Sequence, residues 1–292
     1  MPDENEGFVT SASISTLAVD LLSAQLSLTQ TVSQVPSSDL APASGGETTI
    51  RVPVPREANI QARGSNLDFS EVDEVAIPFD VEHIYDGATV TEHQRSLDIV
   101  DFGTQVLRPQ VRAVVSGAER QLADLMNDLP VDEPVDSDGS NLDNVTADAN
   151  AVLDEAENPM EGRWLSVSPR FAARMFSPGG ASLTDYQGEM ATEALRNGIL
   201  GEYRGFTVVK NPRLTGFRAL AYQTSAFAFS TLVPQPIPGT IDGNVVNEEG
   251  ISLRHVFMVD PRSASTLSLL SVYGGAELVD ADRVVVLGQD DS

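Results

Sequence analysis

The 292-residue sequence contains no cysteine, one lysine (Lys210) and three histidines (His83, His93 and His255). Without cysteine, disulfides, thiol nucleophiles and thiolate-bound metals are excluded. No G-x-S-x-G, H-E-x-x-H or P-loop lysine motif occurs, and phosphoryl transfer would have to rely on arginines alone. No apolar run approaches the ~18–20 residues that span a bilayer, so we expect no membrane association. The three histidines are interpreted as ordinary hydrogen-bonding residues.

Basic residues are scarce as a class. Aspartate and glutamate number 43 against 18 lysines and arginines, which gives a formal net charge of −25. This charge repels nucleic acid, so sequence-specific DNA recognition is disfavoured. Acidity combined with arginine in place of lysine is typical of proteins adapted to concentrated salt, where a Debye length of roughly 3 Å screens self-repulsion. A lysine-poor genome is the alternative explanation for the arginines, but it does not explain the acidity.

What the sequence does contain is a projecting hairpin pattern. The first arm, Thr48 to Pro55, alternates apolar residues at period two, and the returning arm, Glu74 to Tyr85, does the same. Arg63-Gly64-Ser65-Asn66 lies at the tip. Prolines 53, 55 and 78 cannot donate to a ladder, so the hairpin cannot be the middle of a sheet. We interpret it as a ribbon whose partners lie elsewhere.

A long amphipathic helix is predicted from about Thr104 to Leu129. Its apolar stripe repeats at three- and four-residue spacing. Gly117 interrupts good helix formers at a cost of about 1 kcal/mol, which indicates a close neighbour there. Arg108, Arg112 and Arg120 lie on the polar side. They are either a solvated face or a basic stripe that faces a packaged polyanion.

The other segments give a mixed pattern without repeats. Residues 13–30 are predicted as a helix, 31–47 as a linker or extended arm, and 130–158 as an acidic, turn-rich segment with a helix in its second half. The remaining predictions are strands at 89–100, 164–167, 203–210, 219–231, 253–259 and 283–287, helices at 169–176, 186–196 and 263–273, and a loop at 233–250.

Two motifs resemble ligand sites but favour structural roles. Asp136 to Asp143 mimics part of a calcium loop, but the later carboxylates of that pattern are absent. The glycines from Gly198 to Gly205 resemble a phosphate cradle, yet the predicted order is helix, glycines, strand, the reverse of what a cradle requires. We predict a helix stop at Gly198, a tight turn at Gly201 and a bulge at Gly205. No catalytic, metal or cofactor site is predicted.

In the order and type of its predicted segments, the chain resembles major capsid proteins of tailed viruses with the Hong Kong 97-like fold. The features that match are the N-terminal arm, the hairpin, the long helix, the strand-to-helix step Trp164 to Pro169, and the stretch from Gly198 to Asn211. The resemblance implies an α+β fold with an N-terminal arm (1–47), an extended hairpin loop (48–82), a peripheral domain containing a spine helix (83–129 and 263–292) and an axial domain (130–262).

The resemblance implies a non-enzymatic subunit that self-assembles into hexamers, pentamers and an icosahedral shell around viral DNA, which it contacts non-specifically. Assembly would occur in the host cytoplasm with scaffold, portal and cement proteins. Because residues 48–82 contain no lysine, the lysine cross-link of the founding family member is not expected. We expect non-covalent intersubunit contacts in its place, through Arg56, Arg63, Asn66, Glu71 and Asp73. The alternatives are another virion structural protein (tail or adaptor) and, less favoured, a carboxylate-dependent hydrolase.

Overall fold

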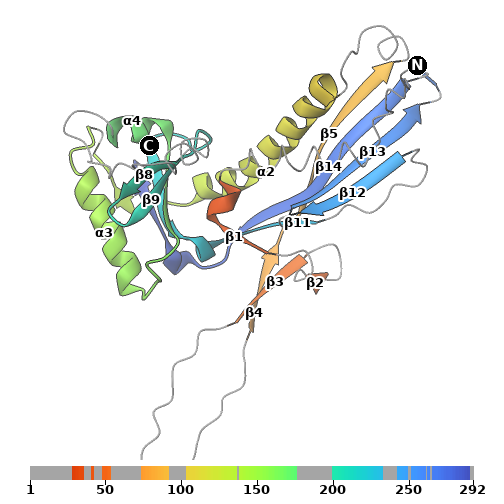
Figure 1. Cartoon of the computed structure of the whole chain (residues 1–292). Helices are drawn as coiled ribbons and strands as arrows, with labels where there is room; N and C mark the ends of the chain where they lie inside the picture. Colours follow the sequence, from red (N-terminus) through yellow and green to blue (C-terminus); the bar gives the residue numbers. More distant parts are fainter. Residues whose placement is uncertain are drawn as a thin grey trace, which may run out of the picture.

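A single helix, α2 (Arg108–Asp128), lies between two sheets and contacts both (Figure 1). The computed structural model describes residues 28–35, 41–42, 48–53, 74–91, 103–136, 138–175, 199–232, 242–248, 251–260, 262–263 and 265–289. Within these residues the elements form an elongated sheet on one side of the molecule, a smaller lobe on the other, and a ribbon that projects away from both (Figure 1). The fold is α+β, as the sequence predicts.

The elongated sheet, here called the long sheet, is built around β14 (Ser265–Leu278). In the described residues its order is β1 (Ser33–Gln34), β11 (Phe227–Leu232), β14, β13 (Ile251–Asp260) and β12 (Asp242–Glu248), and β5 (Glu82–Thr91) pairs with β14 as well. The β1–β11 pair is parallel and the other pairs are antiparallel.

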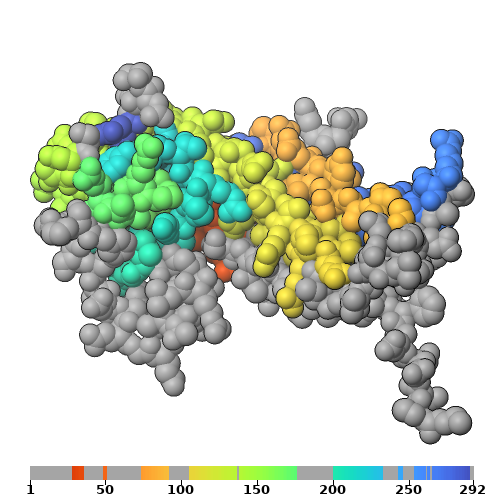
Figure 2. Space-filling view, turned by 90° about the horizontal axis from the view of Figure 1, so that it is seen from above, coloured from red at the N-terminus to blue at the C-terminus, as the bar shows by residue number. Residues whose placement is uncertain are grey.

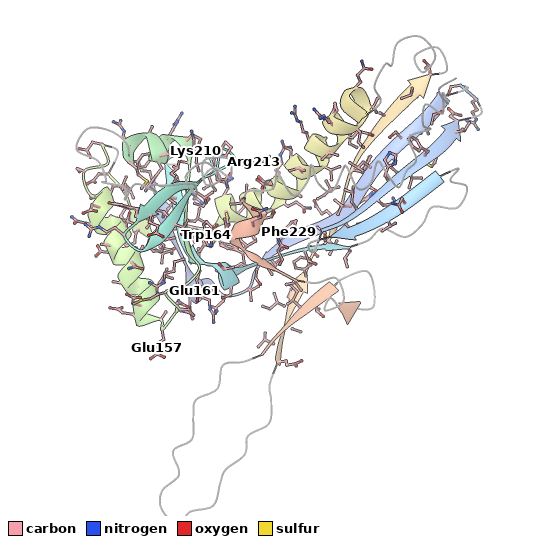
Figure 3. All side chains as sticks on the ribbon, in the orientation of Figure 1. Glu157, Glu161, Trp164, Lys210, Arg213 and Phe229 are labelled. Atoms are coloured by element: carbon pink, nitrogen blue, oxygen red, sulfur yellow. The ribbon has the colours of Figure 1, made fainter. Side chains whose placement is uncertain are left out.

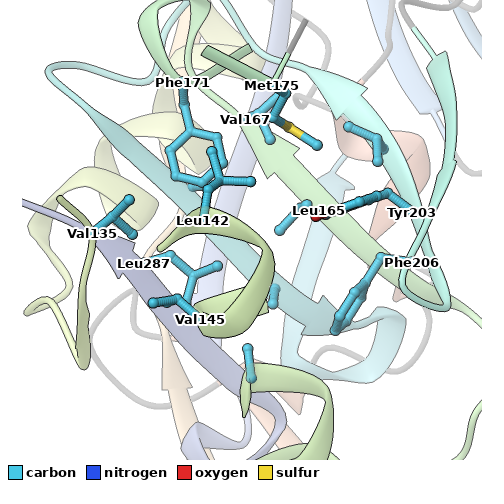
Figure 4. Packing of buried hydrophobic residues seen from close by; sticks show 14 of the residues in the cluster. Val135, Leu142, Val145, Leu165, Val167, Phe171, Met175, Tyr203, Phe206 and Leu287 are labelled. Atoms are coloured by element: carbon cyan, nitrogen blue, oxygen red, sulfur yellow. The ribbon is translucent and has the colours of Figure 1, made fainter. Parts of the chain in front are cut away.

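The lobe contains a second sheet flanked by α3 (Leu142–Glu155) and α4 (Pro169–Met175). Its order is β6 (Glu133–Pro134), β15 (Val284–Gly288), β10 (Arg218–Gln223), β7 (Arg163–Val167), β9 (Phe206–Lys210) and β8 (Ile199–Tyr203). Figure 4 shows the side chains that fill the space between this sheet and its helices, among them Leu165, Phe171 and Phe206, each fully buried.

The two halves of α2 bury different partners. A π-helical turn (Gly103–Leu107) leads into the helix, and Leu107, Val111 and Val114 pack against Leu270 and Val272 of the long sheet. In the second half of the helix the apolar stripe packs against the lobe sheet. Leu122 and Met126 of the helix are buried there with Leu220, Tyr222 and Val286 of the sheet. The predicted apolar stripe is thus used along its whole length, on two sheets in succession.

Gly117 has the close neighbour that the sequence indicates. A Cβ atom built on it would lie 2.6 Å from Cγ2 of Ile84 on β5. The helix and β5 therefore approach closely at this point.

The two arms of the predicted hairpin pair as expected. β3 (Thr48–Pro53) and β4 (Glu74–Phe79) are antiparallel with Ile50 opposite Ile77, and β2 (Ala41–Pro42) pairs with β3. The returning arm does not continue unbroken to Tyr85, because the strand ends at Phe79 and β5 begins at Glu82 in a different sheet. Phe79 is buried with Ile50 and Ala228, and this cluster roots the ribbon in the long sheet.

Residues 263–273 were predicted as a helix, and this is wrong: residues 265–278 form β14. The strand has β5 and β13 on its two sides and apolar residues on both faces, so its sequence lacks the alternation of a half-buried strand. Within the predicted loop at 233–250, residues 242–248 form β12.

The predicted strand at 219–231 is two strands in different sheets. β10 belongs to the lobe sheet and β11 to the long sheet, with the short 3-10 helix η4 (Thr224–Ala226) between them. The final strand, β15, pairs with β10 and β6 in the lobe, and does not return to the long sheet. Strand pairing thus departs from the predicted division at residue 262: β11, β12 and β13 join β14, while β15 joins the lobe.

Several predictions fall wholly or largely outside the described residues: the greater part of the helix at 13–30, the strand at 89–100 beyond residue 91, where β5 ends, and the helix at 186–196. The predictions at 164–167 and 169–176 correspond to β7 and α4. Among the described residues, no helix is both long and apolar enough to cross a membrane.

Gly275 of β14 offers a test of how the ribbon is rooted. A Cβ atom there would lie 2.2 Å from the carbonyl oxygen of Asp80 and 2.9 Å from the ring of Phe79, at the turn between β4 and β5. We expect Gly275→Ala to lower the free energy of unfolding by about 2–3 kcal/mol, because the backbone of residue 80 must move. Urea denaturation of the unassembled subunit measures this.

Gly87→Ala is the matched control, since a Cβ atom on this other strand glycine meets nothing closer than 3.8 Å. It should be neutral or stabilising by up to about 1 kcal/mol. Equal unfolding midpoints for the two variants would show that the close approach at Gly275 is not a constraint.

Candidate assembly surfaces

The ribbon is the first candidate surface. Its described arms, β3 and β4, project from the body of the molecule (Figure 1), and Val75 on β4 is an exposed apolar side chain. The five residues predicted to contact a neighbouring subunit, Arg56, Arg63, Asn66, Glu71 and Asp73, lie outside the described residues. Their contact role stays a prediction.

The outer face of α2 is the second candidate surface. Figure 2 shows this helix (yellow) at the surface between the lobe and β5. Arg108, Arg112 and Arg120 are all exposed, and no ion pair involves them in the part of the chain that the structure describes. The structure therefore leaves three cations accessible on one helix. Whether they face packaged DNA stays a prediction.

A buried carboxylate joins the three parts of the chain that meet at α2. Glu119 is 1% exposed. One of its oxygens accepts a hydrogen bond from the backbone N–H of Leu28 (2.8 Å), and the other accepts one from the Arg213 guanidinium (3.0 Å). Arg213 lies on the loop between β9 and β10, so the carboxylate ties the N-terminal segment and the lobe to the helix. We call this group the Glu119 joint.

Arg218 holds the far end of the same helix. Its Nη1 donates to the carbonyl oxygens of Met126, Asn127 and Leu129 at 3.1, 2.6 and 2.8 Å. The last carbonyls of a helix have no intrahelical partner, and a cation there also interacts favourably with the helix dipole. A residue of the lobe sheet therefore terminates α2.

Arg163 fixes a loop at one end of the lobe. It is 3% exposed and donates to the carbonyl oxygens of Pro159 (3.0 Å) and Asn158 (2.7 Å), while its Nη2 also forms an ion pair with Asp154 (2.7 Å). The loop of residues 156–162, here called the clamped loop, carries Met160, which is 77% exposed. The exposed side chain of Met160 therefore lies on a loop whose conformation is fixed by the buried Arg163.

The glycine stretch is a hairpin, whereas the sequence predicts a helix followed by glycines and a single strand at 203–210. β8 and β9 are joined at Arg204 (φ 50°) and Gly205 (φ 85°), and the register shift lies between Ile199 and Gly201. The turn is predicted at Gly201 and the bulge at Gly205. The structure has them in the opposite order, with the bulge next to Gly201 and the turn at Gly205. Positive φ at two successive residues is the geometry of a type I′ turn, which matches the twist of a hairpin.

Asp143 holds this hairpin against α3. It accepts hydrogen bonds from Tyr203 and from the guanidinium of Arg204. Hydrogen bonding to Arg204, and then to Tyr203, lowers the pKa of the Asp143 carboxyl, and burial together with Asp143 raises the pKa of Tyr203 to about 12. The calcium-like segment forms an exposed turn, as the sequence favours: Asp138 accepts from the Ser140 N–H, and Asp136 accepts from the Ser140 hydroxyl. No side chain among the described residues of this turn caps the N-terminus of α3 by a hydrogen bond.

One serine–histidine pair is present, but it lies in the core. His255 Nε2 lies 2.9 Å from the Ser268 hydroxyl, which donates to Gln110 of α2. All three side chains are at most 1% exposed, so no substrate reaches the hydroxyl. Among the described residues, no group of three or more acidic or histidine side chains is arranged to hold a metal ion.

A projecting ribbon, a long helix laid across a strand-rich sheet, and a lobe with its own sheet together define the Hong Kong 97-like fold of shell-forming proteins. No family model matches the sequence, and no curated protein matches it. The comparison with solved structures, in contrast, finds this fold repeatedly.

Three of the similar structures span nearly the whole chain. The capsid of Ralstonia phage GP4 has a TM-score of 0.60 at 10% identity, covering 90% of this chain and 88% of that chain. The capsid of the cyanophage P-SCSP1u has a TM-score of 0.57 at 11% identity, covering 90% and 87%. An encapsulin complex from Synechococcus elongatus has a TM-score of 0.54 at 15% identity, covering 89% and 86%. The fold is therefore shared over most of this chain and most of each of these structures.

Sequence reasoning missed the Glu119 joint, the Arg218 cap and the Arg163 clamp. Glu119 lies four residues after Val115 and three before Leu122, so it shares the spacing of the buried stripe, and this position is the only signal of its burial. Arg163 is the first residue of β7, and a cation at the start of a mostly apolar strand is the one available signal.

The Glu119 joint gives a stability prediction. Glu119→Ala leaves the Leu28 N–H and the Arg213 guanidinium without their acceptor, so we expect the free energy of unfolding to fall by about 2–3 kcal/mol. Asp124→Ala, at an exposed carboxylate one turn along the same helix, should change it by less than about 0.5 kcal/mol. Chemical denaturation measures both variants, and equal losses would mean that the joint contributes nothing specific.

Proposed function

We propose that this protein is the major capsid protein of a tailed virus and that its copies assemble into an icosahedral shell around double-stranded DNA. The observation that carries the proposal is the likeness to capsid structures over about nine-tenths of both chains. Because the likeness extends over about nine-tenths of this chain, it supports a role for the chain as a shell subunit. The proposed place of the protein is the capsid of the virion, after assembly in the host cytoplasm.

The surfaces described above fit this role without catalysis. The ribbon reaches beyond the body of the subunit, as an arm that lies across a neighbour must. Three accessible arginines on the outer face of α2 supply a weak, sequence-independent attraction for DNA phosphates, in a chain whose net charge is otherwise −25. Scaffold, portal and cement proteins are the expected further partners.

An encapsulin-like shell is the second candidate, because an encapsulin complex has the same fold. What the particles enclose, viral DNA or protein, distinguishes a viral capsid from an encapsulin-like shell. Shell formation itself is tested first. The expressed chain is purified and viewed by negative-stain microscopy, which should show icosahedral shells or capsomer rings. A small discrete oligomer under all conditions would refute shell formation.

Particles isolated from infected cells should protect DNA of genome length from nuclease. Particles that enclose protein but no nuclease-protected DNA would favour the encapsulin-like function. Loss of integrity when salt is diluted to ~0.05 M would support the predicted adaptation to concentrated salt.

The arm itself is tested by deletion. Removal of residues 60–70 should leave a folded subunit that forms no complete shells, because the arm no longer reaches its neighbour. Circular dichroism checks the fold, and sedimentation velocity measures assembly. A variant with the same eleven residues replaced by a glycine–serine segment separates loss of reach from loss of specific contacts. Normal shells from the deletion variant would contradict the role of the ribbon.

A further inference from the structure

The lobe carries opposite charges at the two ends of its sheet. Figure 3 shows Lys210 at one end of the lobe and Glu157 and Glu161 toward the other. The strand register explains this separation. Lys210 ends β9 opposite Val167 at the end of β7, whereas the clamped loop immediately precedes β7.

The acidic end is the clamped loop. Glu157 and Glu161 are exposed on either side of Met160, and neither forms an ion pair within the described residues. Besides the bonds from Arg163, the Gly162 carbonyl accepts from both the N–H and the hydroxyl of Thr224, and the Asn158 side chain donates to the Asp282 carbonyl at 2.9 Å. The loop is thus held by β7 and by two short 3-10 helices, η4 and η5 (Ala281–Arg283), and is pre-organised for contact, which reduces the entropy lost on binding.

The basic end is formed by Lys210 and Arg170, and we use this name for the pair. Arg170 lies in α4 just after the end of β7, and Lys210 is the last residue of β9, the strand paired with β7, so both lie near the same end of the sheet. Both are exposed and without an ion pair in the described part of the chain. Nearby Arg174, in contrast, is close to Asp138, whose carboxyl pKa is lowered mainly by hydrogen bonds from Ser140 and slightly by Arg174.

We infer that the clamped loop of one subunit docks on the basic end of the lobe of a second copy. This inference rests on the proposed function and specifies one of its contacts. Glu157 and Glu161 approach Arg170 and Lys210, and Met160 loses its exposure to water between them. Because the two surfaces differ, the contact is head to tail, and repetition with a closing rotation generates a ring.

Charge complementarity selects a second copy as the occupant. A chain with net charge −25 repels its copies over much of its surface, so favourable encounters require one of its few accessible cations. The basic end supplies two of them, including the only lysine. Complementary charges of this kind fix the orientation and register of the contact, and burial of the methionine adds affinity.

The test reverses the charges at each end separately and then together. Glu157→Lys with Glu161→Lys, or Arg170→Glu with Lys210→Glu, should raise the protein concentration required for shells by about tenfold or more, because like charges then meet. The variant with all four substitutions should assemble near the wild-type concentration. Met160→Ser should raise the requirement roughly fivefold to tenfold without a change of charge.

Asp124→Lys with Asp128→Lys is the matched control, since both are exposed on α2 and the change in charge equals that at the acidic end. It should leave the required concentration within about twofold of wild type. Sedimentation velocity measures assembly, electron microscopy identifies the shells, and thermal melting verifies that every variant is folded.

Wild-type assembly by both single-end variants would overturn the contact and leave the proposed function intact. A folded four-substitution variant that assembles no better than the single-end variants would overturn it as well. Absence of shells from the wild-type chain would overturn both proposals.

Discussion

The burial of a single helix against two sheets is the constraint on which the rest of the structure depends. The first half of α2 covers the long sheet and the second half covers the lobe sheet, so neither sheet has a complete core without it. The Glu119 joint and the Arg218 cap add polar bonds at the same helix, where unmatched groups would be costly. The relative position of the two bodies is therefore set by side-chain packing along one stripe, which a short linker between domains could not achieve.

Local patterns in the sequence are sufficient for the elements that have one clear face. The α2 stripe, the pairing of the two hairpin arms, the α3 helix and the β7–α4 step all follow from period or from proline placement. The failures occur where tertiary structure overrides the pattern. β14 has strands on both sides and apolar residues on both faces, so its sequence shows no alternation. The chain passes from the lobe sheet to the long sheet between β10 and β11, and no residue in this segment indicates that change in the sequence.

Scarcity of cations explains why the candidate site was harder to predict than the fold. Several arginines are committed internally: Arg163 to a loop, Arg213 to Glu119, Arg218 to helix carbonyls and Arg283 to Asp280. Each does work that lysine performs poorly, because the guanidinium donates in several directions at once. Counting charges cannot distinguish these from the exposed arginines of α2. Only the folded chain shows which cations remain available to a partner.

The position of β15 has a consequence for the order in which the subunit is built. Residues 284–288 lie inside the lobe sheet, between β6 and β10, although most of that sheet is encoded far earlier in the chain. During synthesis the lobe therefore waits with an open sheet edge until these residues leave the ribosome. A chain interrupted before them lacks a central strand and cannot complete its lobe. Completion of the lobe sheet therefore depends on one of the last elements along the described chain.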